Sequence, residues 1–298
     1  MIRCHRAMPA IVLALALLAP VPSHAAAEPG PGPEPGAVAS AAHEVPVEGF
    51  MTLTGRVVVD ADGSVSAYAI DHAAQVPDEV EAFLARKAAR WQVRFDEGFA
   101  PPAEPVSFTA RVRASPTEQG LYRLWLDGMY LDEPLPAAHR LRVERRRPPA
   151  YPRDMARVGA SGIVYMLVRI GADGRVEDAF AEQVDLTAMP PDPSRVPQYQ
   201  LEFIASAMTA VRQWRFRIPA EGPFAGEPHE VRVPIVFAMF DRPMAAYGEW
   251  EYLVRGVRKP PPWRPGADPG RDGAVAATGI QHARSRMWLA PEEDGSGG

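Results

Sequence analysis

The chain has 298 residues, of which 47% are hydrophobic, and this is enough for one or two folded cores and excludes a wholly disordered protein. Its 33 Pro and 24 Gly residues cannot all lie inside helices and strands, so part of the chain must be linker or tail. The net charge of −5 provides no concentrated basic surface, which excludes nucleic acid as the main partner.

The first 25 residues have the order of an export signal. Arg3 and Arg6 precede an apolar run over residues 8–19, and Ser23-His24-Ala25 is a small-x-small cleavage pattern. The apolar run is shorter than the ~20 residues that span a bilayer. We therefore predict that residues 1–25 are a cleaved signal peptide, with an uncleaved membrane anchor as the alternative.

Two segments have the composition of linkers. Residues 26–47 are rich in Pro and Gly and poor in large apolar groups, which predicts an extended linker. Residues 241–298 have a similar character and are predicted to be a mostly disordered tail. The tail also contains three tryptophans, which are either incidental or docking points: Trp250, Trp263 and Trp288.

Between these ends, one pattern occurs twice. The second copy begins with a β-rich run, Gly162–Ile170, followed by the pair Asp173-Gly174 and a second strand over 176–184. Asp-Gly between two such runs is a strong hairpin signal, because the turn needs the positive φ that Gly accepts. A helix follows, and then a third strand over 229–240. The helix is predicted to bury the apolar residues that recur at helical spacing: Leu201, Ile204, Ala205, Met208 and Val211.

The first copy has the same order in a shorter form. Strands are predicted over 53–60 and 65–70, joined at Asp62-Gly63, with a third strand over 106–112. The helix between them is expected to bury one apolar side: Val80, Phe83, Leu84, Ala88 and Trp91. We therefore predict an α+β fold of two ββαβ units, each a three-stranded antiparallel sheet packed by a helix.

The remaining segments connect or extend the two copies. The first copy is assigned to residues 48–114 and the second to 147–240, with a connector over 115–146. In the connector, Asp127-Gly128 is expected to form the turn of a short hairpin. In front of the second copy, Tyr151-Pro152 begins a short helix that Gly159 is expected to end.

Four motifs of the second copy carry a resemblance to a known family. They are Tyr151-Pro152 with the residues up to Gly162, then Asp173-Gly174, then the run into Trp214 and Phe216, and then the final strand around Val233 to Phe237. In this order, over about 95 residues, they resemble the TonB C-terminal domain, the periplasmic end of an energy transducer of Gram-negative bacteria. The first copy resembles a degenerate TonB-like repeat, because it keeps the Gly63 turn and Trp91 but lacks the Tyr-Pro opening.

The resemblance implies a periplasmic protein-binding module. In the family, a short receptor segment called the TonB box adds as a strand to the sheet edge, which is β-augmentation. The matching strand here supplies the expected partner-binding residues Arg232, Val233, Ile235, Val236 and Phe237. Replacing Ile235 by Pro is expected to abolish strand addition by removing a donor. Pro234 has no N–H, so it should either face away from a paired strand or mark the limit of pairing.

The family also uses the segment in front of the Tyr-Pro motif, where it often has a Gln. Pro148 and Pro149 occupy that segment here and are included in the expected binding site. The other motif residues are expected to be structural. Trp91, Trp214 and Phe216 lie where a helix meets a sheet and should pack in the core, and Gly63, Gly162 and Gly174 should serve backbone geometry. Asp173 is expected to serve its turn.

Three functions follow from these observations. The first is an exported adaptor that binds a TonB box or another periplasmic protein. The second is a membrane-anchored transducer that couples the ExbB and ExbD motor proteins to outer-membrane receptors, and the third is a structural protein that forms homodimers through its sheet edges. No catalytic or cofactor-binding motif is recognisable, and the only cysteine, Cys4, lies in the predicted signal peptide. An enzyme and a metal site are therefore not expected.

Overall fold

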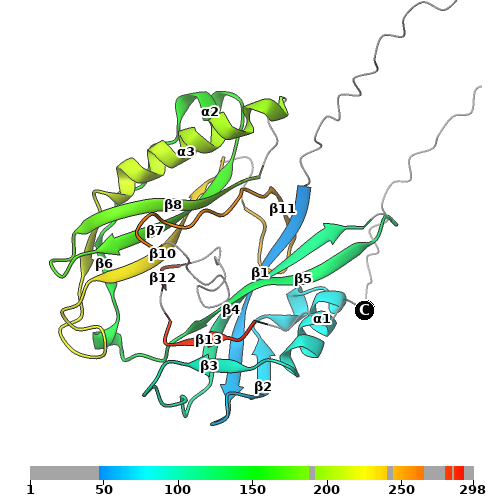
Figure 1. Ribbon diagram of the computed structural model, residues 1–298. Coiled ribbons are helices and arrows are strands. Elements are labelled where there is room, and N and C mark those ends of the chain that lie inside the picture. Colours follow the sequence, from blue (N-terminus) through cyan, green and yellow to red (C-terminus); the bar gives the residue numbers. More distant parts are fainter. Residues whose placement is uncertain are drawn as a thin grey trace, which may run out of the picture. The chain divides into compact units, whose positions relative to one another are not determined.

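The computed structural model describes residues 47–117, 119–187, 192–239, 244–264, 279–283 and 285–291. The predicted signal peptide and nearly all of the predicted linker lie outside these ranges. The described part is an α+β structure of mostly antiparallel strands with three α-helices (Figure 1). Within these ranges, no helix combines the length and the apolar character that crossing a membrane requires.

The helices and strands form two successive groups along the chain. The first group comprises β1 (Val47–Val59), β2 (Val65–Ile70), α1 (Asp78–Ala88), β3 (Val93–Phe95), β4 (Val106–Pro116) and β5 (Tyr122–Asp132). The second comprises β6 (Arg142–Arg145), α2 (Arg153–Arg157), β7 (Gly162–Ile170), β8 (Val176–Leu186), α3 (Val196–Val211), β9 (Arg215–Arg217) and β10 (His229–Phe237). Three short strands follow: β11 (Glu251–Val254), β12 (Gln281–His282) and β13 (Met287–Leu289).

The first group places α1 against the strands β2, β1 and β4. β1 is the central strand and pairs antiparallel with both β2 and β4. α1 buries Val80, Phe83, Leu84 and Ala88, so the predicted apolar face is confirmed. These residues share one core with Trp91, whose side chain is 3% exposed. The face is stable because the i, i+3 and i+4 spacing puts all four side chains on the side that meets the sheet.

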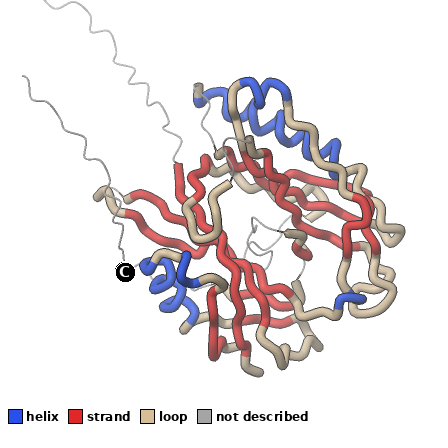
Figure 2. Tube along the Cα trace, turned by 180° about the vertical axis from the view of Figure 1, so that it is seen from behind, coloured by secondary structure: helices blue, strands red, loops and turns tan. Residues whose placement is uncertain are grey.

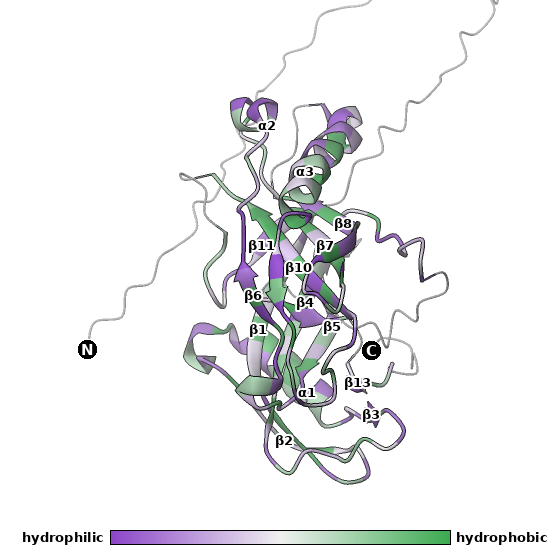
Figure 3. Cartoon of the chain, turned by 90° about the vertical axis from the view of Figure 1, so that its left-hand side faces the viewer, coloured by the Kyte–Doolittle hydropathy of each residue, from purple (hydrophilic) through white to green (hydrophobic). Residues whose placement is uncertain are grey.

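The second group repeats this arrangement, with α3 packed on β8, β7 and β10 (Figure 2). β7 is central and pairs with β8 and β10. The predicted apolar face of α3 is confirmed only in part. Val211 is buried, and Ile204 and Met208 pack partly buried against this core, but Leu201 is 65% exposed. The centre of the buried face is formed by other residues, Tyr199, Phe203, Ala207 and Ala210. The aromatic rings decide the phase because they bury the largest apolar area, and Phe203 packs against Phe237 with the ring centroids 4.7 Å apart. In Figure 3, α3 shows both hydrophobic and hydrophilic sides.

The two Asp-Gly turns make the same contact in both groups. Gly63 has φ +85° and its carbonyl accepts a hydrogen bond from the Val93 N–H at 2.7 Å. Gly174 has φ +75° and its carbonyl accepts one from the Phe216 N–H at 2.9 Å. A Cβ on either glycine would lie within 2.2 Å or 2.0 Å of the carbonyl oxygen of the same facing residue. Glycine is therefore required both for the turn and for the close approach of the strand that follows the helix.

The two sheets are not separate, which corrects the prediction of two three-stranded units. The strand order β12-β10-β7-β8-β11-β1-β4-β5 forms one continuous sheet, with β2 attached to β1. β11 makes the connection, because Val254 pairs with Val47 of β1 and with Leu186 of β8. A segment from near the C-terminus therefore joins the two halves.

The tail also differs from its prediction, because its described residues are ordered by contacts with the rest of the chain. β13 pairs with β3, and β12 pairs with β10. Trp250 packs against the first core, the Trp263 Nε1–H donates to Glu230 Oε1 at 2.6 Å, and Trp288 pairs with Arg94. The three tryptophans are thus docking points within this chain. The composition of the tail hid this because each strand is short and pairs with a distant segment.

Asp127-Gly128 is not a hairpin turn. It lies inside β5, where the register with β4 shifts between Arg111 and Val112, so that Asp127 is the extra residue of a β-bulge. The hairpin turn comes earlier in the chain, after β4. The bulge directs the Asp127 carboxylate toward the guanidinium groups of Arg113 at 3.5 Å and Arg255 at 3.1 Å.

Candidate partner-binding edge

β10 is the strand that the sequence assigns to partner binding, and it lies at the edge of the three strands under α3. Its partner on one side is β7, from His229 opposite Ile170 to Phe237 opposite Gly162. On the other side, the described residues pair with it only at Val231 and Arg232, through β12. The remaining length, Val233 to Phe237, has no strand beside it within the described part of the chain.

Alternation along an antiparallel strand decides which main-chain groups face this edge. The Glu230 carbonyl accepts a hydrogen bond from the Ala283 N–H, so Glu230 faces away from β7. Every second residue then faces the same way, namely Arg232, Pro234 and Val236. We call the main-chain groups of these four residues the partner edge. Pro234 contributes only a carbonyl, so the Val236 N–H is the donor of the uncovered half.

This alternation corrects the expectation for Ile235. Ile235 pairs with Val164 of β7 and its main-chain groups face that strand. A proline at position 235 would therefore break a hydrogen bond inside the sheet, and the position to test is 236. Proline is tolerated at an edge position whose N–H points away from the sheet.

The side chains of the predicted binding residues lie on two faces. Val233, Ile235 and Phe237 are 3%, 1% and 2% exposed and form part of the core under α3. Arg232 is 4% exposed and its Nε lies 2.6 Å from Glu182 Oε2. Val236 is 41% exposed. A partner can therefore use the main chain of this strand, and of these side chains mainly that of Val236.

Val236 borders a cavity of about 240 Å³ between the two halves of the sheet. Phe50 of β1, Tyr165 of β7 and Met244 of the tail also line this cavity. A strand added beside β10 would direct every second side chain to the same face as Val236. The cavity is thus placed to receive an apolar side chain of such a strand.

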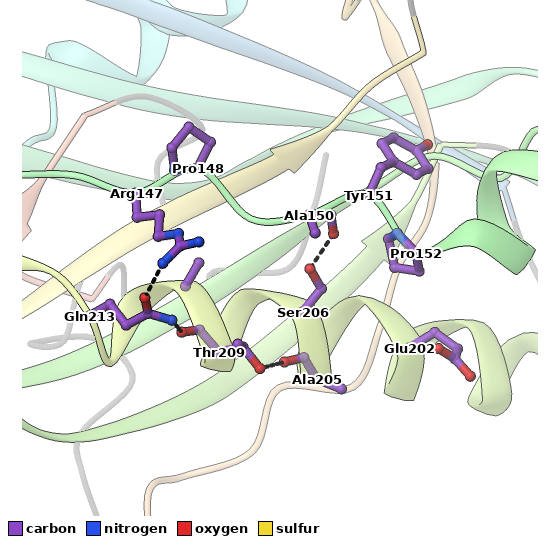
Figure 4. A pocket seen from close by; sticks show the side chains of 11 residues that line it. Arg147, Pro148, Ala150, Tyr151, Pro152, Glu202, Ala205, Ser206, Thr209 and Gln213 are labelled. Carbon is purple, nitrogen blue, oxygen red and sulfur yellow. Dashed lines mark hydrogen bonds between the residues drawn. The ribbon is translucent and has the colours of Figure 1, made fainter.

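The segment before the Tyr-Pro motif lies along α3, as Figure 4 shows. The Trp214 Nε1–H donates to the Arg147 carbonyl at 2.8 Å, and the Ser206 hydroxyl bonds the Ala150 carbonyl. Pro148 is exposed and Pro149 is half-buried. This segment and α3 form a groove of about 540 Å³, which Pro148 lines and Pro149 does not.

Tyr151 brings this segment to the end of β10. Its ring centroid lies 5.8 Å from that of Phe237 and 6.1 Å from that of Phe203, both nearly perpendicular to it. The structure therefore places the two parts of the predicted site, the strand and the preceding segment, next to each other. Pro152 is the residue before α2, Gly162 begins β7, and the Asp173 carboxylate accepts the Arg175 N–H at 2.9 Å in its turn.

In the first half, the edge equivalent to the partner edge is fully occupied. Pairing with the central strand makes Phe108 and Ala110 of β4 equivalent to Val233 and Ile235 of β10. β5 pairs with β4 along its length, from Ser107 opposite Asp132 to Pro116 opposite Tyr122, in antiparallel orientation. In the first half, β5 thus already occupies the edge that is partly uncovered in the second half.

Within residues 47–117, the described start of the first half, no segment takes the place of the one before Tyr151. Trp214 is 0% exposed and uses its indole N–H to hold the Arg147 carbonyl. The equivalent Trp91 is buried, and its indole N–H has no hydrogen-bond partner within the described ranges. The absence of a Tyr-Pro opening in the first copy explains this difference.

Sequence reasoning missed the residues of β12 and its surroundings. Gln281 and Ala283 are 5% and 2% exposed, and the His282 ring stacks on Phe224 with the centroids 4.9 Å apart and the planes at 13°. No motif or periodicity marks a strand this short. Within the described ranges, no group of three or more His, Cys, Asp or Glu residues is placed to hold a metal ion.

The chain matches no protein-family model, and no curated protein sequence matches it.

Proposed function

We propose that this protein is a periplasmic protein-binding module that recognises an extended segment of a partner by strand addition to β10. The observation that carries the proposal is the difference between the two halves. The edge that β5 occupies in the first half is covered in the second only from Glu230 to Arg232, within the described residues. Unpaired main-chain groups at a sheet edge are a ready template for another strand.

The geometry also specifies the form of the partner. By analogy with β5, the added strand runs antiparallel to β10. Its hydrogen bonds are made with the Val236 N–H and with the carbonyl groups of the partner edge. Alternate side chains then meet the face of Val236, where the 240 Å³ cavity favours an apolar group, and the face of Tyr151.

The proposed partner is the TonB box of an outer-membrane receptor, on the basis of the sequence resemblance. Two further features support this choice. The element order β7, β8, α3, β10 follows the expected ββαβ pattern, and the Tyr-Pro segment lies beside the proposed binding strand. We propose the adaptor as the function, with the membrane-anchored transducer and the homodimer as the outcomes that would replace it.

Peptide titration tests strand addition. Synthetic TonB-box peptides are titrated against the full chain and against two variants, Val236→Pro and Val236→Ala. Val236→Pro removes the one N–H of the uncovered half and should weaken binding by about tenfold or more. Val236→Ala keeps the N–H, so most of the affinity should remain.

Circular dichroism spectra and unfolding curves of both variants serve as the control for folding. If the two folded variants lose affinity equally, the partner does not use the main chain of β10. If no TonB-box peptide binds the wild-type chain or Val236→Ala, the proposed partner is wrong.

Cell fractionation with intact mass and N-terminal sequencing tests the location. We expect a periplasmic species that begins near Ala26. An uncleaved chain in the inner-membrane fraction would favour the transducer instead.

A further inference from the structure

The partner edge is partly covered by the chain's own tail. Val231 and Arg232 pair with His282 and Gln281, and the Ala283 N–H donates to the Glu230 carbonyl at 2.8 Å. We call Ile280–Ala283 the tail strand. It is antiparallel to β10, which is the same orientation that β5 has on the equivalent strand of the first half.

The tail strand is held at both of its sides. The His282 N–H donates to the hydroxyl of Tyr130 in β5 at 3.3 Å, so the tail strand lies between β10 and β5. The His282 ring stacks on Phe224, and its centroid lies 5.7 Å from that of His229. These contacts are built from side chains of both halves, and they order the tail strand on the partner edge.

With the tail strand in place, only half of the partner edge, at Pro234 and Val236, is open to a second strand. Residues Val233 to Phe237 offer the Val236 N–H together with the carbonyl groups of Pro234 and Val236. A partner strand that pairs over the full length of β10 must also bond Glu230 and Arg232, which the tail strand covers. The two strands cannot occupy these positions together.

We propose that the tail strand is a built-in competitor, so that a partner binds β10 by displacing Ile280–Ala283. This inference rests on the proposed function for its biological meaning, but the attachment itself is independent of any partner. The attachment is short, since β12 has two residues, and Ile280 remains 37% exposed. A longer partner strand gains hydrogen bonds that the tail strand does not make.

Two variants of the full chain shift the attachment in opposite directions. Ala283→Pro removes the N–H that bonds Glu230 and should release the tail strand, whereas Ala283→Ser retains the N–H and is its matched control. Val231→Cys combined with His282→Cys, in a Cys4→Ser background, should lock it. These two positions are directly opposed and do not hydrogen-bond to each other, which brings their side chains close enough for a disulfide.

The first probe is a labelled peptide with the chain's own sequence from Gly279 to Ser285, measured by fluorescence anisotropy. An occupied edge reduces the apparent affinity of a competing strand by the fraction of molecules in which the edge is free. We expect Ala283→Pro to bind this peptide at least about tenfold more tightly than the wild-type chain and Ala283→Ser. The locked variant should bind it only after reduction.

Equal binding of the Gly279–Ser285 peptide by all four proteins would overturn the proposal, as would binding that is unchanged by reducing the locked variant. The locked variant keeps the test valid even if Ala283→Pro misfolds, because its oxidised and reduced states are compared on one folded protein. A TonB-box peptide is the second probe. If the released variant binds the chain's own peptide but no TonB-box peptide, the competitor stands and the proposed partner fails.

Discussion

At the residue scale, protonation of the His282 ring is expected to make the attachment of the tail strand depend on pH. The titratable and charged groups that act on this ring are the His229 imidazole, the Asp132 carboxylate and the Arg140 guanidinium. Burial, followed by the effect of His229, lowers the pKa of His282 from 6.5 to about 4, and burial also lowers the pKa of His229. The neutral form of His282 is therefore the form that the attached tail strand accepts.

The sign of the pH dependence follows from this pKa. His282 has a lower pKa when attached than when released, so the released state gains protons first as the pH falls. Attachment is expected to be fully stable above about pH 6.5 and to weaken progressively toward pH 4. Hydrogen exchange of the Ala283 amide, expressed as a protection factor at pH 7.5 and pH 5, measures this change.

The matched control is His282→Gln, which keeps a polar side chain but does not titrate in this range. Its protection factor should vary less with pH than that of the wild-type chain. A wild-type protection factor that stays constant from pH 7.5 to pH 5 would contradict the role of His282.

At the scale of the elements, local signals were sufficient where one turn or one helix face decides the structure. The two Asp-Gly turns and the buried face of α1 lie where the sequence places them. Asp127-Gly128 has the same dipeptide but lies in a bulge, because β5 continues on both sides of it. Which side of α3 is buried depends on the contact between Phe203 and Phe237. These residues lie in different elements, so helical spacing alone does not predict the contact.

The glycine of the second turn provides a test at this scale. In Gly174→Ala, the new Cβ meets the Phe216 carbonyl oxygen at 2.0 Å in a backbone of positive φ. Gly159 also has positive φ, but a Cβ there meets no atom within 4 Å. We expect Gly159→Ala to lower the free energy of unfolding by about 1 kcal/mol and Gly174→Ala to lower it by clearly more.

Urea unfolding of both variants measures the difference. Gly159→Ala controls for the strain of the positive φ, so the excess loss in Gly174→Ala reports the contact with the strand after α3. Equal losses in the two variants would show that this close approach adds nothing to stability.

At the scale of the whole molecule, buried charges connect the two halves to the tail. Arg111 of β4 is 2% exposed, and its guanidinium lies 2.8 Å from Asp185 Oδ2 of β8, which is 0% exposed. Asp185 also accepts the Gly256 N–H at 3.0 Å and the Gln183 amide at 2.7 Å. Neither the partners nor their burial could be predicted from the sequence, because β4, β8 and residue 256 meet only after the continuous sheet has formed.

Removing one charge of this pair should be costly. Arg111→Met leaves the Asp185 carboxylate buried with only neutral hydrogen-bond donors, and breaking a buried pair in this way costs about 3–5 kcal/mol. Arg111→Met combined with Asp185→Leu removes both charges and should lose less than the sum of the single variants. Chemical denaturation of the four proteins forms the double-mutant cycle, and additive losses would show that the pair is not coupled.

The pairing of β13 with β3 has a consequence for the order in which the chain is made. β3 lies in the first half, but Met287, which is 0% exposed, completes the core around it. Closing a loop between segments this far apart is slow, because the entropy of the intervening chain is lost before the contact forms. During synthesis, the half that emerges first from the ribosome therefore completes its core only after the whole second half has been translated.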